Sequence, residues 1–144
     1  MDTPATYAFE PESPALQTSD FALLADFRYE LRRFSLFSET EAQEHGLSPQ
    51  QHQALLVIKG MSVPPTVTDL AQRLCIKTHS TAELVSRLAQ MGMVTRQNDP
   101  QDGRRALVHL TPLAERTLAS LSAVHQTQLQ NIRPLLVGFL EKFS

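Results

Sequence analysis

The sequence predicts a mainly α-helical fold that carries one small β-hairpin, and three observations support this prediction. Several segments repeat apolar residues at three- and four-residue spacing, which is typical of amphipathic helices. The segment 104–110 instead places Val108 and Leu110 at a period of two, which is typical of a strand. A turn-rich stretch separates it from a second candidate strand at 93–97, so the two segments are expected to pair as a hairpin.

A long helix is predicted from about residue 18 to residue 44. Thr18 or Ser19 can cap its first backbone donors. Its apolar stripe has 3-4-3 spacing and consists of Leu24, Phe27, Leu31 and Phe34. The preceding residues contain three prolines among Thr, Ser, Ala and Glu. Residues 1–19 are therefore interpreted as an arm that is disordered or lies on a partner subunit.

Two shorter helices are predicted next, each with an N-terminal cap. The motif S-P-Q-Q at 48–51 is a capping box with Pro at the first helical position, so a helix should run from there to about Gly60. Thr66 and Asp69 form the T-x-x-D start of the following helix. The apolar face of this third helix consists of Val67, Leu70, Ala71 and Leu74.

The fourth predicted helix, from about Thr78 to Met91, combines a buried stripe with a polar N-terminal end. The stripe consists of Leu84, Val85, Leu88 and Met91, and Gly92 is suited to end the helix. The polar end comprises Lys77, Thr78, His79, Ser80 and Thr81. Side chains of these types can reach base edges and phosphates, so this helix is the candidate recognition helix.

The predicted hairpin carries charges at its tip. Turn residues occur at 98–100 (N-D-P) and 102–103 (D-G), and Arg104 and Arg105 follow them. We expect Asp102 to brace the tip by holding arginine geometry, although a solvated tip is the alternative. Two short helices followed by a charged hairpin form a winged helix-turn-helix, which holds one helix in the major groove of DNA while the hairpin reaches the backbone or minor groove.

A further helix is predicted from Thr111-Pro112 to about Ile132, with Pro134 opening a separate terminal segment. That segment is strongly apolar and includes Leu135, Leu136, Val137, Phe139, Leu140 and Phe143. Neither it nor the 24–34 stripe has obvious cover within one small domain. Burial against a second copy in a homodimer is therefore expected.

With these motifs in place, the chain resembles the MarR family of winged-helix transcriptional regulators. The resemblance covers roughly residues 20–144 and is carried by LAQRL at 70–74, STAELVSRLAQMGMV at 80–94 and, most specifically, D-P-x-D-G-R-R-x-L-V-x-L-T at 99–111. One departure is Cys75, since such proteins often have Gly in this turn. The resemblance implies repression of genes, relieved by a small, often aromatic or phenolic, ligand bound between the dimer helices and the DNA-reading part. Phe34, Phe37, His52 and His125 are candidate lining residues by position.

The sequence accordingly predicts a sequence-specific DNA-binding regulator. Residues 20–144 are interpreted as one domain, with a winged helix-turn-helix at 46–110 and dimerisation helices at 20–45 and 111–144. The expected partners are double-stranded DNA with an inverted-repeat operator, a second copy of the chain and a small-molecule effector. The predicted DNA contacts are Thr66, Lys77, Thr78, His79, Ser80, Arg87, Arg96, Arg104 and Arg105.

The distribution of charge agrees with this prediction better than the net charge of −2 does. Residues 1–67 hold four Lys/Arg and nine Asp/Glu, a balance of −5, whereas residues 68–105 hold six and four, a balance of +2. Residues 106–144 contribute +1, from three basic and two acidic residues. The positive charge therefore falls on the segment that would face DNA, and two copies in a dimer would double it.

Other function classes have less support. The sequence lacks phosphate-binding glycine loops and nucleophile motifs, so no enzyme, catalytic residue or cofactor is predicted. The five histidines show no H-x-x-H or H-x-x-x-H pair, so no metal site is predicted, and zinc sensing is kept as an alternative. Cys75 is expected to be a small buried residue, with a redox role as its alternative.

The chain is expected to act in the cytoplasm without a membrane partner. Its single cysteine suits a reducing compartment, and neither a signal peptide nor an apolar run long enough to cross a bilayer is present. An adaptor protein whose winged helix no longer reads DNA is the alternative from another function class. Binding to DNA that weakens steeply with salt would distinguish the two.

Overall fold

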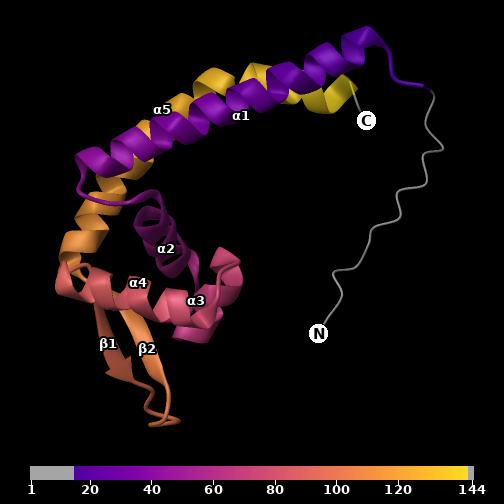
Figure 1. Cartoon of the computed structure of the whole chain (residues 1–144). Coiled ribbons are helices and arrows are strands. Elements are labelled where there is room, and N and C mark those ends of the chain that lie inside the picture. The colour runs from indigo at the N-terminus through magenta and orange to yellow at the C-terminus, as the bar shows by residue number, and fades with distance from the viewer. Residues whose placement is uncertain (1–14, 143–144) are drawn as a thin grey trace.

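The computed structural model describes residues 15–142, so most of the predicted arm at 1–19, together with residues 143–144, lies outside the described residues. The elements in chain order are α1 (Thr18–Glu44), α2 (Pro49–Gly60), α3 (Val67–Leu74), α4 (Thr78–Gln90), β1 (Val94–Asn98), β2 (Ala106–Leu110) and α5 (Pro112–Lys142). In Figure 1, α1 and much of α5 lie side by side as an elongated helical layer, and the elements from α2 to β2 form a head at one end of it. The prediction of a mainly helical fold with one two-stranded antiparallel hairpin is confirmed.

The core of the head lies where α2, α3, α4 and β2 meet. Leu55, Leu70, Val85 and Val108, one from each of these elements, are completely buried in a single apolar cluster. Leu121 of α5 belongs to the same cluster, so α5 joins the head to the helical layer. The backbone N–H of Val108 also donates to the carbonyl of Pro65 at 2.8 Å, which ties the hairpin to the loop before α3.

The caps of α2 and α3 form as the sequence predicts. At the start of α2, the Ser48 hydroxyl accepts from the Gln51 backbone N–H at 3.1 Å, and the Gln51 side chain accepts from the Ser48 N–H at 2.9 Å. Thr66 and Asp69 make the same reciprocal pair at 3.2 and 2.9 Å. Each pair satisfies two backbone donors that a helix start otherwise leaves without a partner.

The start of α1 differs from the prediction by one residue. Its N-cap is Gln17, ahead of the predicted Thr18 or Ser19, and the Gln17 N–H donates to the Asp20 carboxylate at 2.9 Å. The acid at the third helical position therefore sets the start, because it accepts the N-cap backbone donor.

The prediction that Pro134 opens a separate terminal segment is wrong. Pro134 lies inside α5, which continues from Pro112 to Lys142. A proline within a helix costs about 3 kcal/mol locally, because it lacks an N–H and clashes with the preceding turn. Packing on both sides of it offsets this cost: Ile132 is buried, and the Phe139 ring stacks on Phe27 of α1 with centroids 4.1 Å apart.

The Phe27–Phe139 stack also corrects the expectation that the stripe of α1 lacks cover within the chain. Part of that stripe packs against α5 of the same chain. Large apolar side chains nevertheless stay exposed on both helices, among them Phe21, Tyr29 and Leu140 at 58%, 60% and 65%. The layer therefore pairs its two helices and still presents an apolar surface.

Two residues that were predicted to be buried are exposed. Cys75 is an exposed free cysteine that adopts the left-handed conformation (φ 56°, ψ 38°) as the C-cap of α3. Met91 is 36% exposed at the end of α4, because the chain turns at Gly92 (φ 76°) and places Met93 in the core instead. Burial was expected from residue type at Cys75 and from the helical period at Met91, but the direction of the turn decides it at both positions.

Candidate nucleic-acid interface

Helix α4 has one face in the core of the head and the opposite face on the surface. Thr81, Leu84, Val85 and Leu88 are buried. Residues about half a turn away are exposed, and they recur at three- and four-residue spacing as His79, Glu83, Arg87 and Gln90. The helix is therefore held firmly from behind and offers a row of polar side chains to the outside.

The structure brings the predicted contacts at the N-terminus of α4 together. Lys77 is its N-cap, and Lys77, Thr78, His79 and Ser80 are all exposed. Thr81, which the sequence placed in the same polar cluster, is completely buried, and its hydroxyl donates to the Lys77 carbonyl at 2.9 Å. It supports the helix from inside instead of facing a ligand, because position 81 falls on the core side of the helical turn.

The tip of the hairpin differs in detail from the prediction. Arg104 and Arg105 were placed in the second strand but lie in the turn, since β2 begins at Ala106. Asp102 braces the tip through the backbone: its carboxylate accepts from the Arg104 N–H at 3.1 Å, and its carbonyl accepts from the Arg105 N–H at 3.0 Å. The prediction was that Asp102 holds the arginine side chains, but these hydrogen bonds go to backbone N–H groups instead. Both arginine side chains are exposed and extend from a turn whose backbone is fixed.

Thr66 lies between the hairpin and α3, but it is mostly hidden. The residue is 8% exposed, and its hydroxyl is engaged with the Asp69 N–H. The Thr66 backbone N–H, and to a smaller extent the charge of Arg105, lowers the pKa of Asp69. Thr66 and Asp69 line a surface hollow together with Arg104 and Arg105, so the start of α3 meets the base of the hairpin tip there.

Arg96 of β1 connects the hairpin to α4. Its guanidinium Nη2 donates to the Ser86 hydroxyl at 2.5 Å, across ten residues of sequence. Both residues were near the predicted interface, but only Arg96 was among the predicted contacts. Ser86 holds an exposed cation beside the outward face of α4, which no local pattern could indicate.

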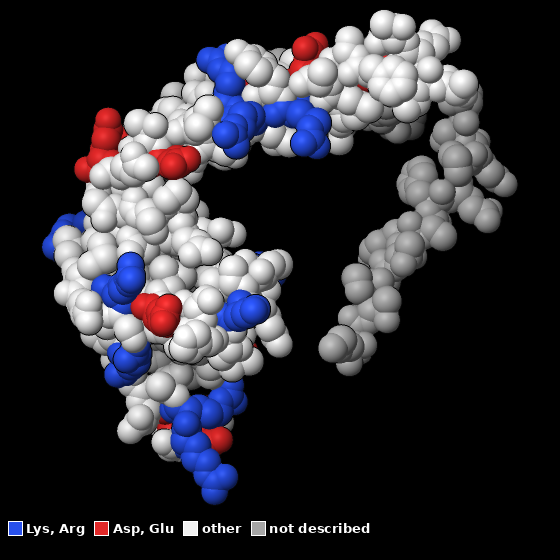
Figure 2. Space-filling model, viewed as in Figure 1, with Lys and Arg blue, Asp and Glu red and all other residues white. Residues whose placement is uncertain are grey.

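The charges of this surface gather along α4 and on the hairpin. Figure 2 shows Lys and Arg side chains over α4 and at the tip of the hairpin, with an acidic patch on α4 between basic ones. The sequence places one acidic residue in α4, Glu83, and its Oε1 lies 3.4 Å from the Nε2 of His79. Sequence reasoning missed Glu83 and Gln90 as surface residues of this helix, although the helical period that predicted the buried stripe also implied its opposite face.

A second candidate site lies where the helical layer meets the head. A cavity of about 610 Å³ is bordered by α1, α2 and α5. Three of the four predicted lining residues border it: Phe34, His52 and His125. Phe37 does not, and its ring instead contacts His125 edge-on with centroids 5.6 Å apart. Apolar walls with a few polar groups are typical of small-molecule pockets.

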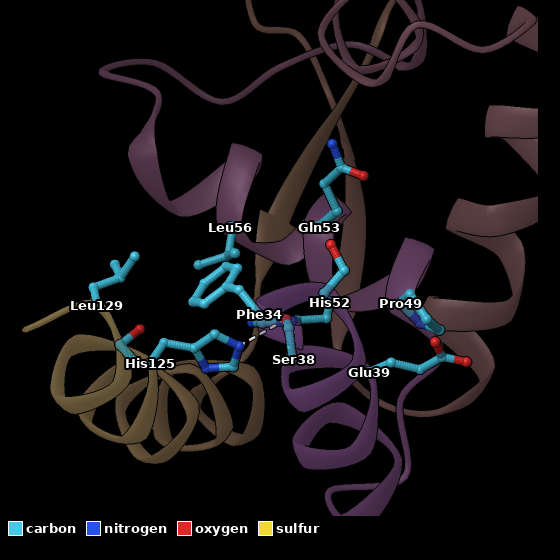
Figure 3. Close-up of a pocket in the computed structure, with 11 residues that line it drawn as sticks. Phe34, Ser38, Glu39, Pro49, His52, Gln53, Leu56, His125 and Leu129 are labelled. Carbon is cyan, nitrogen blue, oxygen red and sulfur yellow. Dashed lines mark hydrogen bonds between the residues drawn. The ribbon is translucent and has the colours of Figure 1, made fainter. Parts of the chain in front are cut away.

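His125 links all three helices at this cavity (Figure 3). Its Nδ1 lies 2.7 Å from the Leu121 carbonyl, so that nitrogen donates, and in the neutral ring Nε2 accepts from the Ser38 hydroxyl at 2.7 Å. The ring centroid of buried His52 is 5.1 Å from that of His125. Burial, followed by the charges of His125 and His45, lowers the pKa of His52.

Within residues 15–142, no group of three or more His, Cys, Asp or Glu side chains is arranged to hold a metal ion. Over the same range, no helix has the length and apolar character needed to cross a membrane.

Comparison with known proteins agrees with the fold just described. Residues 45–105, which cover the head from α2 to the hairpin tip, match the model of the MarR family. An uncharacterized HTH-type transcriptional regulator of Bacillus subtilis, YkoM, is 24% identical over 106 residues, covering 72% of this chain and 68% of its own. The head is therefore similar in sequence to a family of transcriptional regulators.

Solved structures show the same fold over most of the chain. A mutant of MepR from Staphylococcus aureus, bound to an oligodeoxyribonucleotide, has a TM-score of 0.71 at 15% identity and covers 90% of this chain and all of its own. AbsC, a MarR family transcriptional regulator from Streptomyces coelicolor, has a TM-score of 0.68 at 17% identity, covering 83% and 81%. The chain is therefore similar to the MarR family of transcriptional regulators: its head matches the family model, and most of its length has the fold of these solved structures.

Proposed function

We propose that the protein is a sequence-specific DNA-binding regulator in which α4 enters the major groove and the hairpin reaches the adjacent backbone or minor groove. The observation that carries this proposal is the arrangement of α4, whose core face is buried while its outward face and the nearby hairpin tip expose cationic and short polar side chains. The oligodeoxyribonucleotide bound to MepR, which has the same fold, supports this proposal.

The predicted contacts then divide into three roles. Thr78, His79 and Ser80 at the start of α4 are placed to meet base edges, whereas the cations would meet phosphates. Those cations are Lys77, Arg87, Arg96, Arg104 and Arg105. Thr66 would act as the cap that positions α3, because its hydroxyl is already engaged.

The protein is proposed to act as a C2 homodimer through residues 20–45 and 111–144. Its support is the apolar surface that α1 and α5 leave exposed, including Phe21, Tyr29 and Leu140. Exposed apolar surface of this extent favours association. Two heads related by a twofold axis would read an inverted repeat whose half-sites lie about 34–36 Å apart, one turn of DNA.

The cavity at the junction is proposed to bind a small, aromatic or phenolic effector that releases a repressor from DNA. The aromatic ring of Phe34 and the polar atoms of His52 and His125 border the same space. Because α1, α2 and α5 all contribute to its wall, a ligand there can favour one angle of the head over another. A ligand that weakens DNA binding must itself bind more weakly to the DNA-bound protein, by the same factor.

The test is a titration of fluorescent duplexes at several salt concentrations, with an operator selected from a randomised pool. We expect an inverted repeat to be selected and the affinity to fall steeply with salt, because bound cations displace counterions from the phosphates. His79→Ala and Ser80→Ala should each cost about 1–3 kcal/mol on the selected site and much less on random DNA. Binding that is absent, or indifferent to salt, would favour the adaptor function instead.

A further inference from the structure

The position of Glu83 is unusual for a surface that faces DNA. With 100° per residue, the buried residues Thr81, Leu84, Val85 and Leu88 centre on one side of α4, and Glu83 lies almost directly opposite. Its side chain is 68% exposed. The single acid of the recognition helix therefore lies at the middle of the face that would enter the groove, not at its edge.

A carboxylate in that place cannot help the protein to hold the DNA backbone. Phosphates repel it, so it lowers affinity for any duplex that offers it no hydrogen-bond donor. The basic side chains Arg87 and Arg96 are exposed beside it and can take the phosphate contacts. A favourable contact for Glu83 must therefore come from a base edge.

The major groove offers a carboxylate only two donors, the N4 amino group of cytosine and the N6 amino group of adenine. Adenine presents its N7 acceptor beside N6, and that acceptor repels the second carboxylate oxygen. Cytosine presents no acceptor of its own beside N4 in the major groove. Cytosine is therefore the base that a carboxylate prefers.

The surroundings of Glu83 suit such a contact. The His79 Nε2 lies 3.4 Å from Glu83 Oε1, one helical turn earlier, which restrains the carboxylate and leaves Oε2 open. A hollow of about 420 Å³ on the outer face of α4 is bordered by Glu83 together with Ala82, Ser86, Arg87 and Gln90. The Glu83 side chain is 68% exposed there, so a base edge can reach the acid.

We propose that Glu83 is a specificity-determining residue that selects cytosine at one position of each operator half-site and penalises duplexes lacking it. This inference rests on the proposed reading of DNA by α4. It adds a discriminating acid to the contacts considered above, which were all neutral or basic.

The experiment compares the full-length wild type with Glu83→Gln in selection from a randomised duplex pool, followed by titrations on the selected duplexes. Glu44→Gln, at the exposed end of α1, is the matched control, because it removes the same charge from a helix outside the head. Wild type and control should select cytosine at the Glu83 position, with roughly tenfold discrimination against other bases. Glu83→Gln should select adenine there, since glutamine bonds both N6 and N7, and should bind random duplex more tightly than the control does.

Two results would overturn the inference. Glu83→Gln could select the same base with the same discrimination as wild type. It could also gain affinity for all duplexes equally while the preferred base stays unchanged, in which case Glu83 only repels phosphate. A wild type that selects no sequence and binds duplex without salt dependence would instead refute the proposed DNA-binding function, so the two failures are distinct.

Discussion

The turn between α3 and α4 stores strain that one substitution should release. Cys75 adopts φ 56° and ψ 38° as the C-cap of α3, the one residue other than glycine with a positive φ among those that the structure describes. The left-handed conformation costs a residue with a Cβ about 1–2 kcal/mol, because the Cβ approaches the following carbonyl oxygen. Glycine has no Cβ and is the residue that helices most often place at such an end.

We expect Cys75→Gly to stabilise the protein by about 0.5–1 kcal/mol. Relief of the left-handed strain contributes about 1–2 kcal/mol, and the greater freedom of glycine in the unfolded chain removes about 0.5–1 kcal/mol of that gain. The thiol contributes little in return, since it is exposed and its hydrogen bond to the Gln72 carbonyl is long, at 3.8 Å. For a chain of this size, the melting temperature should rise by about 1–4 °C.

The assay is urea unfolding followed by circular dichroism, and Cys75→Ala is the matched control. Alanine removes the thiol but keeps the Cβ, so it should leave the stability of the wild type nearly unchanged. The reasoning would be refuted if both variants changed the free energy of unfolding equally, because the effect would then come from the sulfur and not from the backbone. The slope of unfolding against urea should be the same in all three proteins.

Three further predictions test the surface, the assembly and the junction. Arg104→Ala should reduce the slope of log affinity against log salt by about one per subunit, whereas the control Arg116→Ala on α5 should leave that slope unchanged. Equal slopes for the two variants would mean that the hairpin tip is only solvated. Leu140→Glu should yield monomers in sedimentation experiments, while Val63→Glu, a head residue that is also 65% exposed, should remain dimeric; dimers in both would place the interface elsewhere. The folded protein lowers the pKa of His52 below the ordinary value of 6.5, so the unfolded chain takes up the proton more readily. The free energy of unfolding should therefore be highest above pH 6.5 and should decline as the pH falls below that value. His52→Gln should flatten this decline in urea midpoints, and an unchanged pH profile would contradict the assignment.

Much of the fold could be predicted from local chemistry. The capping pairs Ser48–Gln51 and Thr66–Asp69 involve residues three apart, so the sequence alone contains both partners and the helix starts follow from it. The buried stripe of α4 follows from its helical period, and the resemblance to a regulator family follows from the hairpin motif. These features depend on neighbours along the chain.

The predictions that failed depended on neighbours across the fold. Pro134 looks like a helix boundary by its own chemistry, and only the Phe27–Phe139 stack and the burial of Ile132 show why α5 continues through it. Cys75 looks like a buried residue by type, and only the direction of the turn places it on the surface. In both cases the tertiary arrangement outweighs a local preference of a few kcal/mol at most.

The two candidate sites also combine features that are set locally along the chain with features that are set by tertiary packing. The sequence by itself determined the winged helix-turn-helix and the basic residues that surround it, because these follow from spacing and residue type. Only the tertiary structure placed Ser86 against Arg96 and brought His52 beside His125 at the wall of the cavity, since these pairs come from separate elements. Spacing along the chain specifies which face of a helix is polar, but the distance between two helices depends on how their apolar faces pack.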